Sequence, residues 1–305
     1  MTAHLVERDS QAYARLATIA ALYPDIEVKT YPGEFISALP RILGDVPEDA
    51  FAFFLIDPMG WRIPLRGLST MLARRKSEVI FNFMFDFINR AANIRDPIVV
   101  AGLDELIPFG DWRIRLEKAE RDGATPEQRK EILVAAFTES LARIGAFAYV
   151  AETTILRPLE DRPLYCLCYA TRHRMGIEVF RDCQIKALEE QSKTRAATKV
   201  KHAQVVSGQR EIFQSLHDMG PDELADFLQR ERSKAEATLV ALAPVIPGAA
   251  RYDEVWPKVL ARHVVRRTDV NQIAARLRSE HRLIFPDSEK GKRIPQPLYR
   301  IQRPL

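Results

Sequence analysis

The stretch that decides the fold is Phe54-Leu55-Ile56-Asp57-Pro58-Met59-Gly60-Trp61. It closes an almost continuous apolar run that begins at residue 50. A run of this kind, bounded by Asp-Pro, is typical of a strand buried on both faces of a parallel sheet, so we expect it to be a central strand. Ligands of open α/β folds bind beyond the carboxyl ends of the strands, which makes the end of this run the first place to look for a site.

The segments around this run alternate short apolar stretches with amphipathic ones, which is the pattern of a parallel sheet covered by helices. This predicts a Rossmann-like α/β sheet in the first third of the chain. The expected strands cover residues 3–7, 26–31, 50–56 and 78–85, and the expected helices between them cover residues 10–23, 33–43 and 64–75.

The pattern changes after residue 94. A loop containing Phe109-Gly110-Asp111-Trp112 is expected first, and then a helix with Thr125 as N-cap, Pro126 at its first position and Gln128 completing a capping box. The spacing of the next two apolar segments predicts an antiparallel hairpin over residues 149–156 and 163–171. We expect an α/β domain over residues 1–205 with a helical insertion at about 110–146, a helical connector over 206–250, and a small domain over 251–305.

Two of the expected strand ends carry residues suited to a nucleotide. Glu7 ends the first strand, where an acid in nucleotide-binding folds accepts hydrogen bonds from ribose hydroxyls. Gly33 and Glu34 follow the second strand and open a helix, which places backbone N–H groups and a carboxylate at the same edge. A solvated surface glutamate is the alternative interpretation of Glu7.

The end of the third strand carries a carboxylate that could contact a substrate. Asp57, fixed by Pro58, can accept a proton or a hydrogen bond from a substrate amine while the Trp61 ring stacks on its base. The alternative is a plain strand-to-helix turn in which Asp57 caps the helix and Trp61 packs.

These residues resemble the second, third and fourth motifs of class I S-adenosylmethionine-dependent methyltransferases. A longer set is similar to the three-Cys-motif partner family (TcmP), which are methyltransferase-like proteins with a C-terminal winged helix, encoded beside a radical-SAM protein that carries a three-cysteine motif. The set comprises residues 53–61, Ile80-Phe81-Asn82-Phe83 with Arg90, Gly110-Asp111-Trp112, and Tyr169-Ala170-Thr171-Arg172-His173 with Gly176.

The resemblance implies a cofactor, roles for the strand ends, and a partner. S-adenosylmethionine would be the cofactor, bound by Glu7, Gly33 and Glu34, with Glu7 on its ribose and Glu34 near its adenine. Asp57 and Pro58 would face the methyl-accepting group. The radical-SAM three-Cys-motif protein would be a partner.

One departure from the family pattern concerns the first motif, a strand that ends in a Gly-rich turn, which residues 1–305 do not contain. In the methyltransferase order this strand lies in the centre of the sheet, between the expected strands 3–7 and 50–56. Losing it would leave two rows of backbone groups unpaired, at roughly 1–3 kcal/mol for each unsatisfied group. We therefore expect either a gene start assigned too late or a rearranged sheet, and no methylation by the 305-residue chain.

The C-terminal segment differs from the rest in charge. Residues 251–305 hold 13 Lys and Arg against 6 Asp and Glu, whereas residues 1–250 hold 32 against 35. Two helices, a strand over residues 282–285, a basic turn and a strand over residues 297–302 are expected, which is the outline of a winged helix. A basic surplus suits DNA or RNA, although a protein-binding module or a solvated surface fits as well. The residues expected to contact nucleic acid are Asn271, Arg276, Arg278, Lys290, Lys292 and Arg293.

Composition narrows the class of protein. The apolar runs have strand length rather than membrane length, and the first residues lack the layout of a signal peptide, which predicts a cytoplasmic protein. Cys166 and Cys168 are expected to be core residues, and no metal site is expected. Two hypotheses remain: a methyltransferase-like enzyme acting on nucleic acid or together with its radical-SAM partner, or a non-catalytic adaptor that binds nucleic acid or protein.

Overall fold

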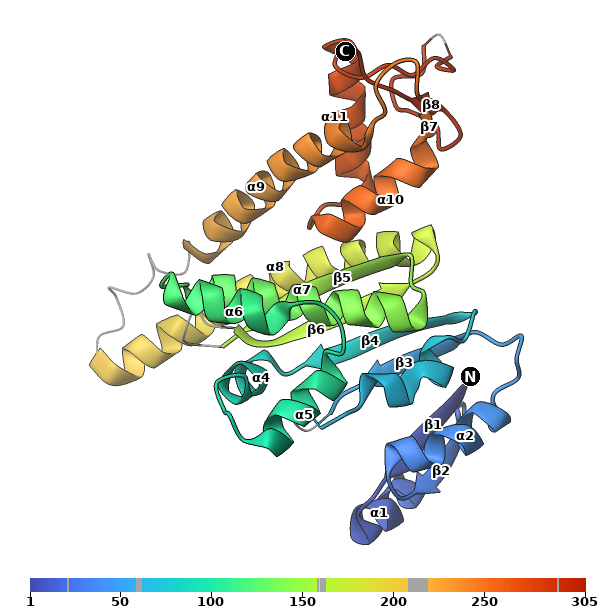
Figure 1. Cartoon of the computed structure of the whole chain (residues 1–305), viewed down its shortest axis with the longest axis vertical. Coiled ribbons are helices and arrows are strands. Elements are labelled where there is room, and N and C mark those ends of the chain that lie inside the picture. The colour runs from blue at the N-terminus through green and yellow to red at the C-terminus, as the bar shows by residue number, and fades with distance from the viewer. Residues whose placement is uncertain (21, 59–61, 158, 160–162, 208–218, 290) are drawn as a thin grey trace.

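The computed structural model describes residues 1–305 apart from 21, 59–61, 158, 160–162, 208–218 and 290. The chain has a mixed α/β fold with three parts: an N-terminal lobe, a central sheet with helices on both faces, and a helical C-terminal region (Figure 1). Every helix that the structure describes is too short or too polar to cross a bilayer.

The N-terminal lobe is a two-stranded parallel sheet of β1 (Thr2–Glu7) and β2 (Glu27–Pro32) between two helices, α1 (Ser10–Ala20) and α2 (Phe35–Asp45). Thr30 contacts Tyr13 of α1 through hydroxyls 3.2 Å apart, and the Tyr31 hydroxyl donates to Asp45 at the end of α2 (2.7 Å). Neighbouring residues of a strand point to opposite faces, so the two helices cover opposite faces of this sheet.

The central sheet has four strands in the order β3-β4-β6-β5. Their bounds are β3 Ala52–Ile56, β4 Ser77–Phe83, β5 Tyr149–Leu156 and β6 Pro163–Thr171. β3 and β4 are parallel, whereas β6 runs antiparallel to both β4 and β5. The predicted antiparallel hairpin is therefore confirmed.

β3 is the edge strand of this sheet, and the prediction of a central strand buried on both faces is wrong. Phe53 and Leu55 are 53 % and 68 % exposed, while Ile56 on the other face is buried. β1 and β2 form a separate sheet and do not pair with β3 in the described part of the chain. An apolar run shows that a strand could be buried on both faces. Whether it is buried depends on which elements pack beside it, and the run itself does not specify them.

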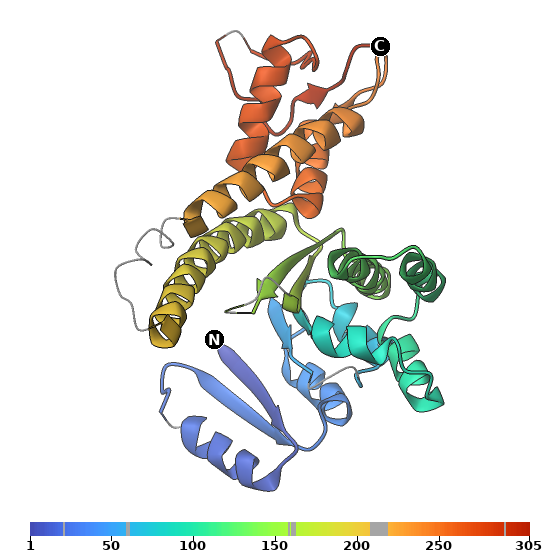
Figure 2. The same ribbon diagram turned by 90° about the vertical axis from the view of Figure 1, so that its left-hand side faces the viewer.

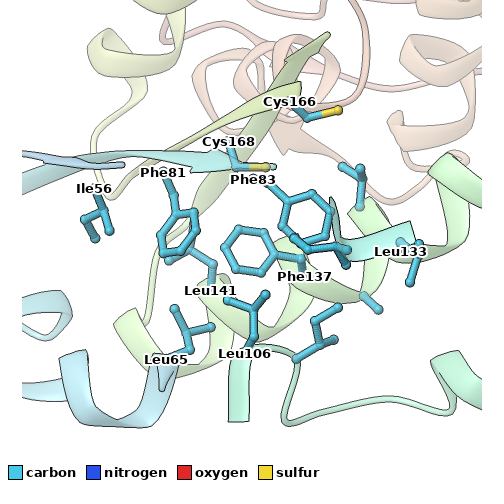
Figure 3. Packing of buried hydrophobic residues seen from close by; sticks show 14 of the residues in the cluster. Ile56, Leu65, Phe81, Phe83, Leu106, Leu133, Phe137, Leu141, Cys166 and Cys168 are labelled. Carbon is cyan, nitrogen blue, oxygen red and sulfur yellow. The ribbon is translucent and has the colours of Figure 1, made fainter. Parts of the chain in front are cut away.

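A group of helices covers one face of the central sheet and encloses the main hydrophobic core. Phe137 lies between Phe81 and Phe83, with ring centroids 4.7 Å apart in both pairs (Figure 3). The bounds are η1 Leu65–Leu68, α3 Ser69–Leu72, α4 Phe85–Ala91, α5 Pro97–Leu106, α6 Trp112–Arg121 and α7 Pro126–Gly145.

The capping box predicted at the start of α7 is present. Thr125 Oγ1 accepts from the Gln128 N–H (3.3 Å), and the Gln128 side chain accepts from the Thr125 N–H (2.9 Å). The loop expected before it is present at Phe109-Gly110-Asp111, but it is shorter than expected, because α5 ends at Leu106 and Trp112 already begins α6. Asp96 caps α5 ahead of Pro97, a start signal that was legible in the sequence.

The opposite face of the sheet is covered by α8 (Arg174–Ser207), on which Phe180 stacks against Tyr169 of β6 at 4.6 Å between ring centroids. Arg181 of α8 is 2 % exposed and donates to the Leu260 carbonyl (2.6 Å) and the Ala261 carbonyl (3.1 Å) near the end of helix α10 (Tyr252–Arg262). The last carbonyls of a helix have no partner within it, so this buried guanidinium joins the C-terminal region to the sheet.

The C-terminal region packs three helices around a second core that includes Trp256, Val259 and Leu277. The predicted strands over 282–285 and 297–302 are reduced to an Ile284–Gln302 bridge and the two residues of β8, and a short strand before α10 was not predicted. The elements are α9 Met219–Leu242, β7 Ala250–Arg251, α10 Tyr252–Arg262, α11 Arg267–Ser279 and β8 Arg300–Ile301, with β7 antiparallel to β8.

Candidate functional site

Glu7, Gly33 and Glu34 lie together at the carboxyl edge of the β1–β2 sheet. Glu7 is paired with Pro32 in the strand register, and its carbonyl accepts from the Gly33 N–H at 2.9 Å. Gly33 has a φ of +112°, a left-handed conformation that favours glycine, although the space around it is open. The parallel register therefore brings the predicted cofactor-side residues to one edge.

Both carboxylates at this edge already have partners in the chain. Glu7 Oε1 accepts from the backbone N–H of Asp9 (2.8 Å), and Glu34 Oε1 accepts from Arg8 Nη1 (3.0 Å). The hydrogen bond from Arg8 to Glu34 raises the pKa of this guanidinium. Glu34 is the N-cap residue of α2 but makes no side-chain cap, and its side chain is 63 % exposed. The Glu34 carboxylate is thus exposed to solvent, with Arg8 as its neighbour.

Asp57 lies at the carboxyl end of β3, exposed, with the half-buried Pro58 next to it. Its Oδ1 accepts from Asn82 Nδ2 at 2.7 Å. Asn82 is one residue from the end of β4. Ile56 is paired with Phe81 in the parallel register, so the next residues of the two strands, Asp57 and Asn82, lie opposite each other. Trp61, the predicted stacking residue, lies outside the described residues.

Asn82 is a site residue that the sequence-based prediction did not single out. Its Oδ1 is buried and makes no hydrogen bond within the described structure, although its amide N–H holds Asp57. A buried acceptor without a partner is costly, and such groups are common at sites that take a ligand. The signal in the sequence was an Asn inside an apolar strand, opposite the residue that follows the neighbouring strand.

A second polar group sits where β4 turns into α4. Asp86 Oδ2 accepts from Arg157 Nη2 at 2.7 Å and lies 3.6 Å from Arg90 Nη2. The Arg90 guanidinium stands 4.8 Å from the centroid of the Phe87 ring, which is 47 % exposed. Arg157 follows β5, which is parallel to β4 because both are antiparallel to β6. These groups therefore share the sheet edge of Asp57.

The groups at this edge can recognise a polar ligand. An exposed carboxylate, an amide, two guanidinium groups and an open aromatic ring suit a planar, hydrogen-bonding substrate. No group of three or more His, Cys, Asp or Glu residues able to hold a metal ion occurs in the described part of the chain.

Arg172, one of the residues that carry the family resemblance, has a structural role. It donates to the carbonyl of Arg74 (2.8 Å) and, by its other terminal nitrogen, to the carbonyls of Leu72 and Gly145. These last two carbonyls end helices α3 and α7. The guanidinium therefore closes helix ends and is not available to a ligand.

The neighbouring Gly176 is required by close packing. A Cβ added there would lie 2.3 Å from Glu78 Oε1 and 2.5 Å from the Tyr169 hydroxyl. Glu78 in turn accepts from the Thr171 hydroxyl (3.0 Å). The residues from Tyr169 to Gly176 thus form a packed corner between β4, β6 and α8.

The cysteines behave as predicted. Cys166 and Cys168 are fully buried in the main core, on the face of β6 that α7 covers. Burial raises the pKa of the Cys166 thiol to about 12, which leaves it protonated and unreactive at neutral pH. Cys183 is exposed on α8.

The residues predicted to contact nucleic acid are largely engaged within the chain. Asn271 accepts from the Tyr252 hydroxyl (2.8 Å), Arg276 pairs with Glu236 of α9, and Lys292 pairs with Glu289 (2.8 Å). Arg278 is half-buried with one terminal nitrogen unpartnered, Arg293 is exposed, and Lys290 lies outside the described residues.

The Lys and Arg residues of this region mainly form ion pairs with neighbouring acidic residues. Arg267 contacts Glu178 (3.1 Å) and Arg266 contacts Glu189 (3.3 Å), and both acids belong to α8. Arg300 pairs with Asp287 (2.8 Å). The cations therefore hold the region against α8 and α9 more than they form one outward-facing patch.

No protein-family model, no curated protein and no solved structure matches this chain.

Proposed function

We propose that this chain is a methyltransferase-like protein of the three-Cys-motif partner type, dependent on S-adenosylmethionine and acting on nucleic acid or together with its radical-SAM partner. Glu7, Gly33 and Glu34 form the cofactor side, and Asp57, Pro58 and Trp61 form the acceptor side. Asn82 orients Asp57 by the 2.7 Å hydrogen bond from its amide.

The observation that carries this proposal is the arrangement of the two sheets. The family resemblance implies a sheet in which one strand separates the strand of Glu7 from the strand of Asp57. β1 and β3 are the strands that end in these two acids, and they belong to two separate parallel pairs with no hydrogen bond to each other in the described chain. This is the arrangement expected of that sheet without its central strand.

The C-terminal region supports the same proposal. α9, β7, α10, α11, the Ile284 bridge and β8 follow one another in an order that fits a winged helix. The exposed Arg293 in the turn before β8 is the described cation best placed to meet a phosphate backbone.

Calorimetry with S-adenosylmethionine tests the enzyme proposal on two forms of the protein. We expect no binding by residues 1–305, and micromolar binding by an extended form in which a strand ending in a Gly-rich turn, the first methyltransferase motif, is fused before Met1. Glu7→Gln should abolish binding by the extended form, whereas Glu27→Gln, an exposed acid at the start of β2, should leave it unchanged. An extended form that binds nothing, or that binds equally well with Glu7→Gln, would contradict the proposal.

A second candidate is a non-catalytic adaptor. It is favoured by the engagement of the cofactor-side carboxylates with Arg8 and the Asp9 N–H, since a cofactor would have to displace or share these bonds. Titration with duplex DNA and with RNA at several salt concentrations separates its two versions. A steep fall in affinity with salt, weakened further by Arg293→Ala, indicates a nucleic-acid adaptor, and salt-insensitive or absent binding indicates a protein partner.

A further inference from the structure

Two guanidinium groups at the carboxyl edge of the central sheet share one carboxylate. Arg157, which follows β5, donates by Nη2 to Asp86 Oδ2 at 2.7 Å, and Arg90 Nη2 lies 3.6 Å from the same oxygen. Asp86 is the acid that each of these arginines contacts in the described part of the chain. Two positive charges therefore lie beside one negative charge, an arrangement that attracts a further anion.

Both guanidinium groups keep hydrogen-bond donors for a ligand. A guanidinium has five N–H donors, and Arg90 uses its Nε on the Asp86 carbonyl (3.1 Å). Nη1 of Arg90, and Nε and Nη1 of Arg157, make no hydrogen bond within the described chain. The two side chains are 63 % and 37 % exposed, so a ligand can reach these donors. Planar donor groups of this kind bind phosphate oxygens in pairs.

The positions of the two arginines are fixed by neighbouring groups. The Arg157 carbonyl accepts from Arg195 Nε at 3.0 Å, which holds the segment after β5 against α8. Arg90 is fixed by its bond to the Asp86 carbonyl, one turn earlier in α4. A ligand therefore loses little affinity to the ordering of these side chains.

An aromatic ring lies next to the two cations. Phe87 is 47 % exposed, and Arg90 Cζ is 4.8 Å from the centroid of its ring. A surface ring with a guanidinium beside it provides a platform on which a planar base can stack. Only a base that is not already stacked inside a duplex can use such a platform, so this surface favours a single strand.

These groups and the acceptor side of the proposed function lie along one edge. Asp57 follows β3, Asp86 follows β4, and Arg157 follows β5, in a sheet of order β3-β4-β6-β5. The Arg157 side chain reaches across the start of β6 to Asp86. An extended ligand that runs along this edge therefore meets Asp57 and the two arginines in succession.

We propose that Arg90 and Arg157 bind a backbone phosphate of a single-stranded nucleic acid, and that Phe87 stacks on one of its bases, so that a neighbouring nucleotide reaches Asp57. The inference rests on the proposed function only in taking Asp57 as the acceptor side. Carboxylates of an acidic peptide can also pair with the arginines, but they would leave the exposed Phe87 ring without a partner.

Binding of fluorescent octanucleotides by residues 1–305, measured by anisotropy without S-adenosylmethionine, tests this assignment. Single-stranded DNA and RNA octamers should bind with affinities within about threefold of each other, because the proposed contacts are to phosphate and base and not to the sugar. The matched duplex should bind about tenfold more weakly or worse. Tighter binding of the duplex, or no binding of either single strand, would overturn the inference.

Substitutions of the proposed contacts sharpen the test. Arg90→Ala and Arg157→Ala should each weaken binding by about fivefold and reduce the slope of log affinity against log salt by about 0.7. Phe87→Ala should weaken binding by about fivefold, whereas Phe87→Tyr should retain it. Arg143→Ala is the matched control and should change nothing. Arg143 also pairs with an acid one turn away and lies 4.5 Å from a phenylalanine ring centroid, but it is near the start of β5.

A cross-linking measurement on the unsubstituted chain does not depend on how the variants fold. A single-stranded octamer carrying 5-iodouracil should cross-link to the tryptic peptide that contains Phe87, and cross-links confined to residues 219–305 would overturn the inference. Equal losses for Arg143→Ala and Arg90→Ala would overturn it too. So would displacement of the octamer by a polyglutamate peptide as readily as by unlabelled octamer, because the ligand would then be an acidic protein.

The outcome is separate from that of the proposed function. Octamer binding that depends on Arg90, Arg157 and Phe87 supports this inference even if no form of the protein binds S-adenosylmethionine. Conversely, cofactor binding by the extended form without any octamer binding would overturn this inference and leave the enzyme proposal intact.

Discussion

The N-terminal lobe and the C-terminal region are attached to the central sheet in very different ways. The C-terminal region shares a continuous hydrophobic core with the outer face of β5, β6 and α8, and the buried Arg181 joins α8 to the end of α10. The N-terminal lobe has its own two-stranded sheet and reaches the main core through α2 (Figure 2). The C-terminal region is therefore fixed by packing against the central sheet, whereas the N-terminal lobe is attached through α2 and leaves a sheet edge without a partner strand in the described chain.

The largest expected effect concerns the attachment of the C-terminal region to the central sheet. Arg181→Met should lower the free energy of unfolding by about 3 kcal/mol, because it leaves buried carbonyls of α10 without a donor. Urea denaturation measures this loss. Lys186→Met, at an exposed position of the same helix, is the control, and an equal loss in both variants would show that Arg181 does not link the two parts.

Acid pH should weaken the same region through Glu231 of α9. Burial alone would raise the pKa of this carboxyl, but the nearby His263 imidazole (3.7 Å) and hydrogen bonds from the Val264 N–H and Lys234 lower it to about 2. A lowered folded-state pKa contributes stability above the ordinary value of 4.5, and this stability is lost as the pH falls toward 2.

Between these two pH values the wild type should therefore lose roughly 2 kcal/mol that Glu231→Gln does not lose. Thermal unfolding at a series of pH values checks the difference. Glu223→Gln, at an exposed acid of α9, should follow the wild type. Parallel acid profiles for the wild type and Glu231→Gln would refute this role.

A smaller effect is expected in the N-terminal lobe. Tyr31 is 2 % exposed, donates to Asp45 (2.7 Å) and lies 2.7 Å from His4 Nδ1. Tyr31→Phe should destabilise the lobe by about 1 kcal/mol, since it removes one buried hydroxyl and leaves two partly solvated partners. Hydrogen exchange in β1 and β2 should accelerate while exchange in α10 and α11 stays unchanged. Acceleration in all four elements would mean that the two ends unfold together.

The smallest expected effect is at the strand-end surface. Arg8 and Glu34 are 77 % and 63 % exposed, so their ion pair contributes little. Arg8→Ala should leave the midpoint of urea denaturation unchanged. A clear shift of the midpoint to lower urea would give Arg8 a structural role and make Glu34 less available to a ligand.

Local features of this fold were predicted from the sequence more accurately than the packing of one element beside another. The capping box of α7, the β5–β6 hairpin and the burial of Cys166 and Cys168 depend on nearby residues, and all three are confirmed. The burial of β3 was wrong because it depends on which strand lies beside it. α5 was missed although Asp96 and Pro97 are signals of a helix start.

Residues of the candidate site could be predicted from the sequence, but the hydrogen bonds and ion pairs that they make could not. Glu7, Gly33 and Asp57 were found because strand ends can be recognised in a sequence. The bond from Asn82 to Asp57 depends on the register of β3 against β4, which the sequence leaves open. The pairing of Arg276 with Glu236 likewise depends on how α9 packs against α11, and a charge count cannot reveal it.

The central claim, that β3 is paired on one side only, is tested most directly by the backbone amides of four consecutive residues. Hydrogen exchange followed by NMR on residues 1–305 should be slow at Phe54 and Ile56, which face β4, and at least a hundredfold faster at Phe53 and Leu55, which face the open edge. Equal protection of all four amides would contradict the account, because it would mean that β3 already has a strand on both sides.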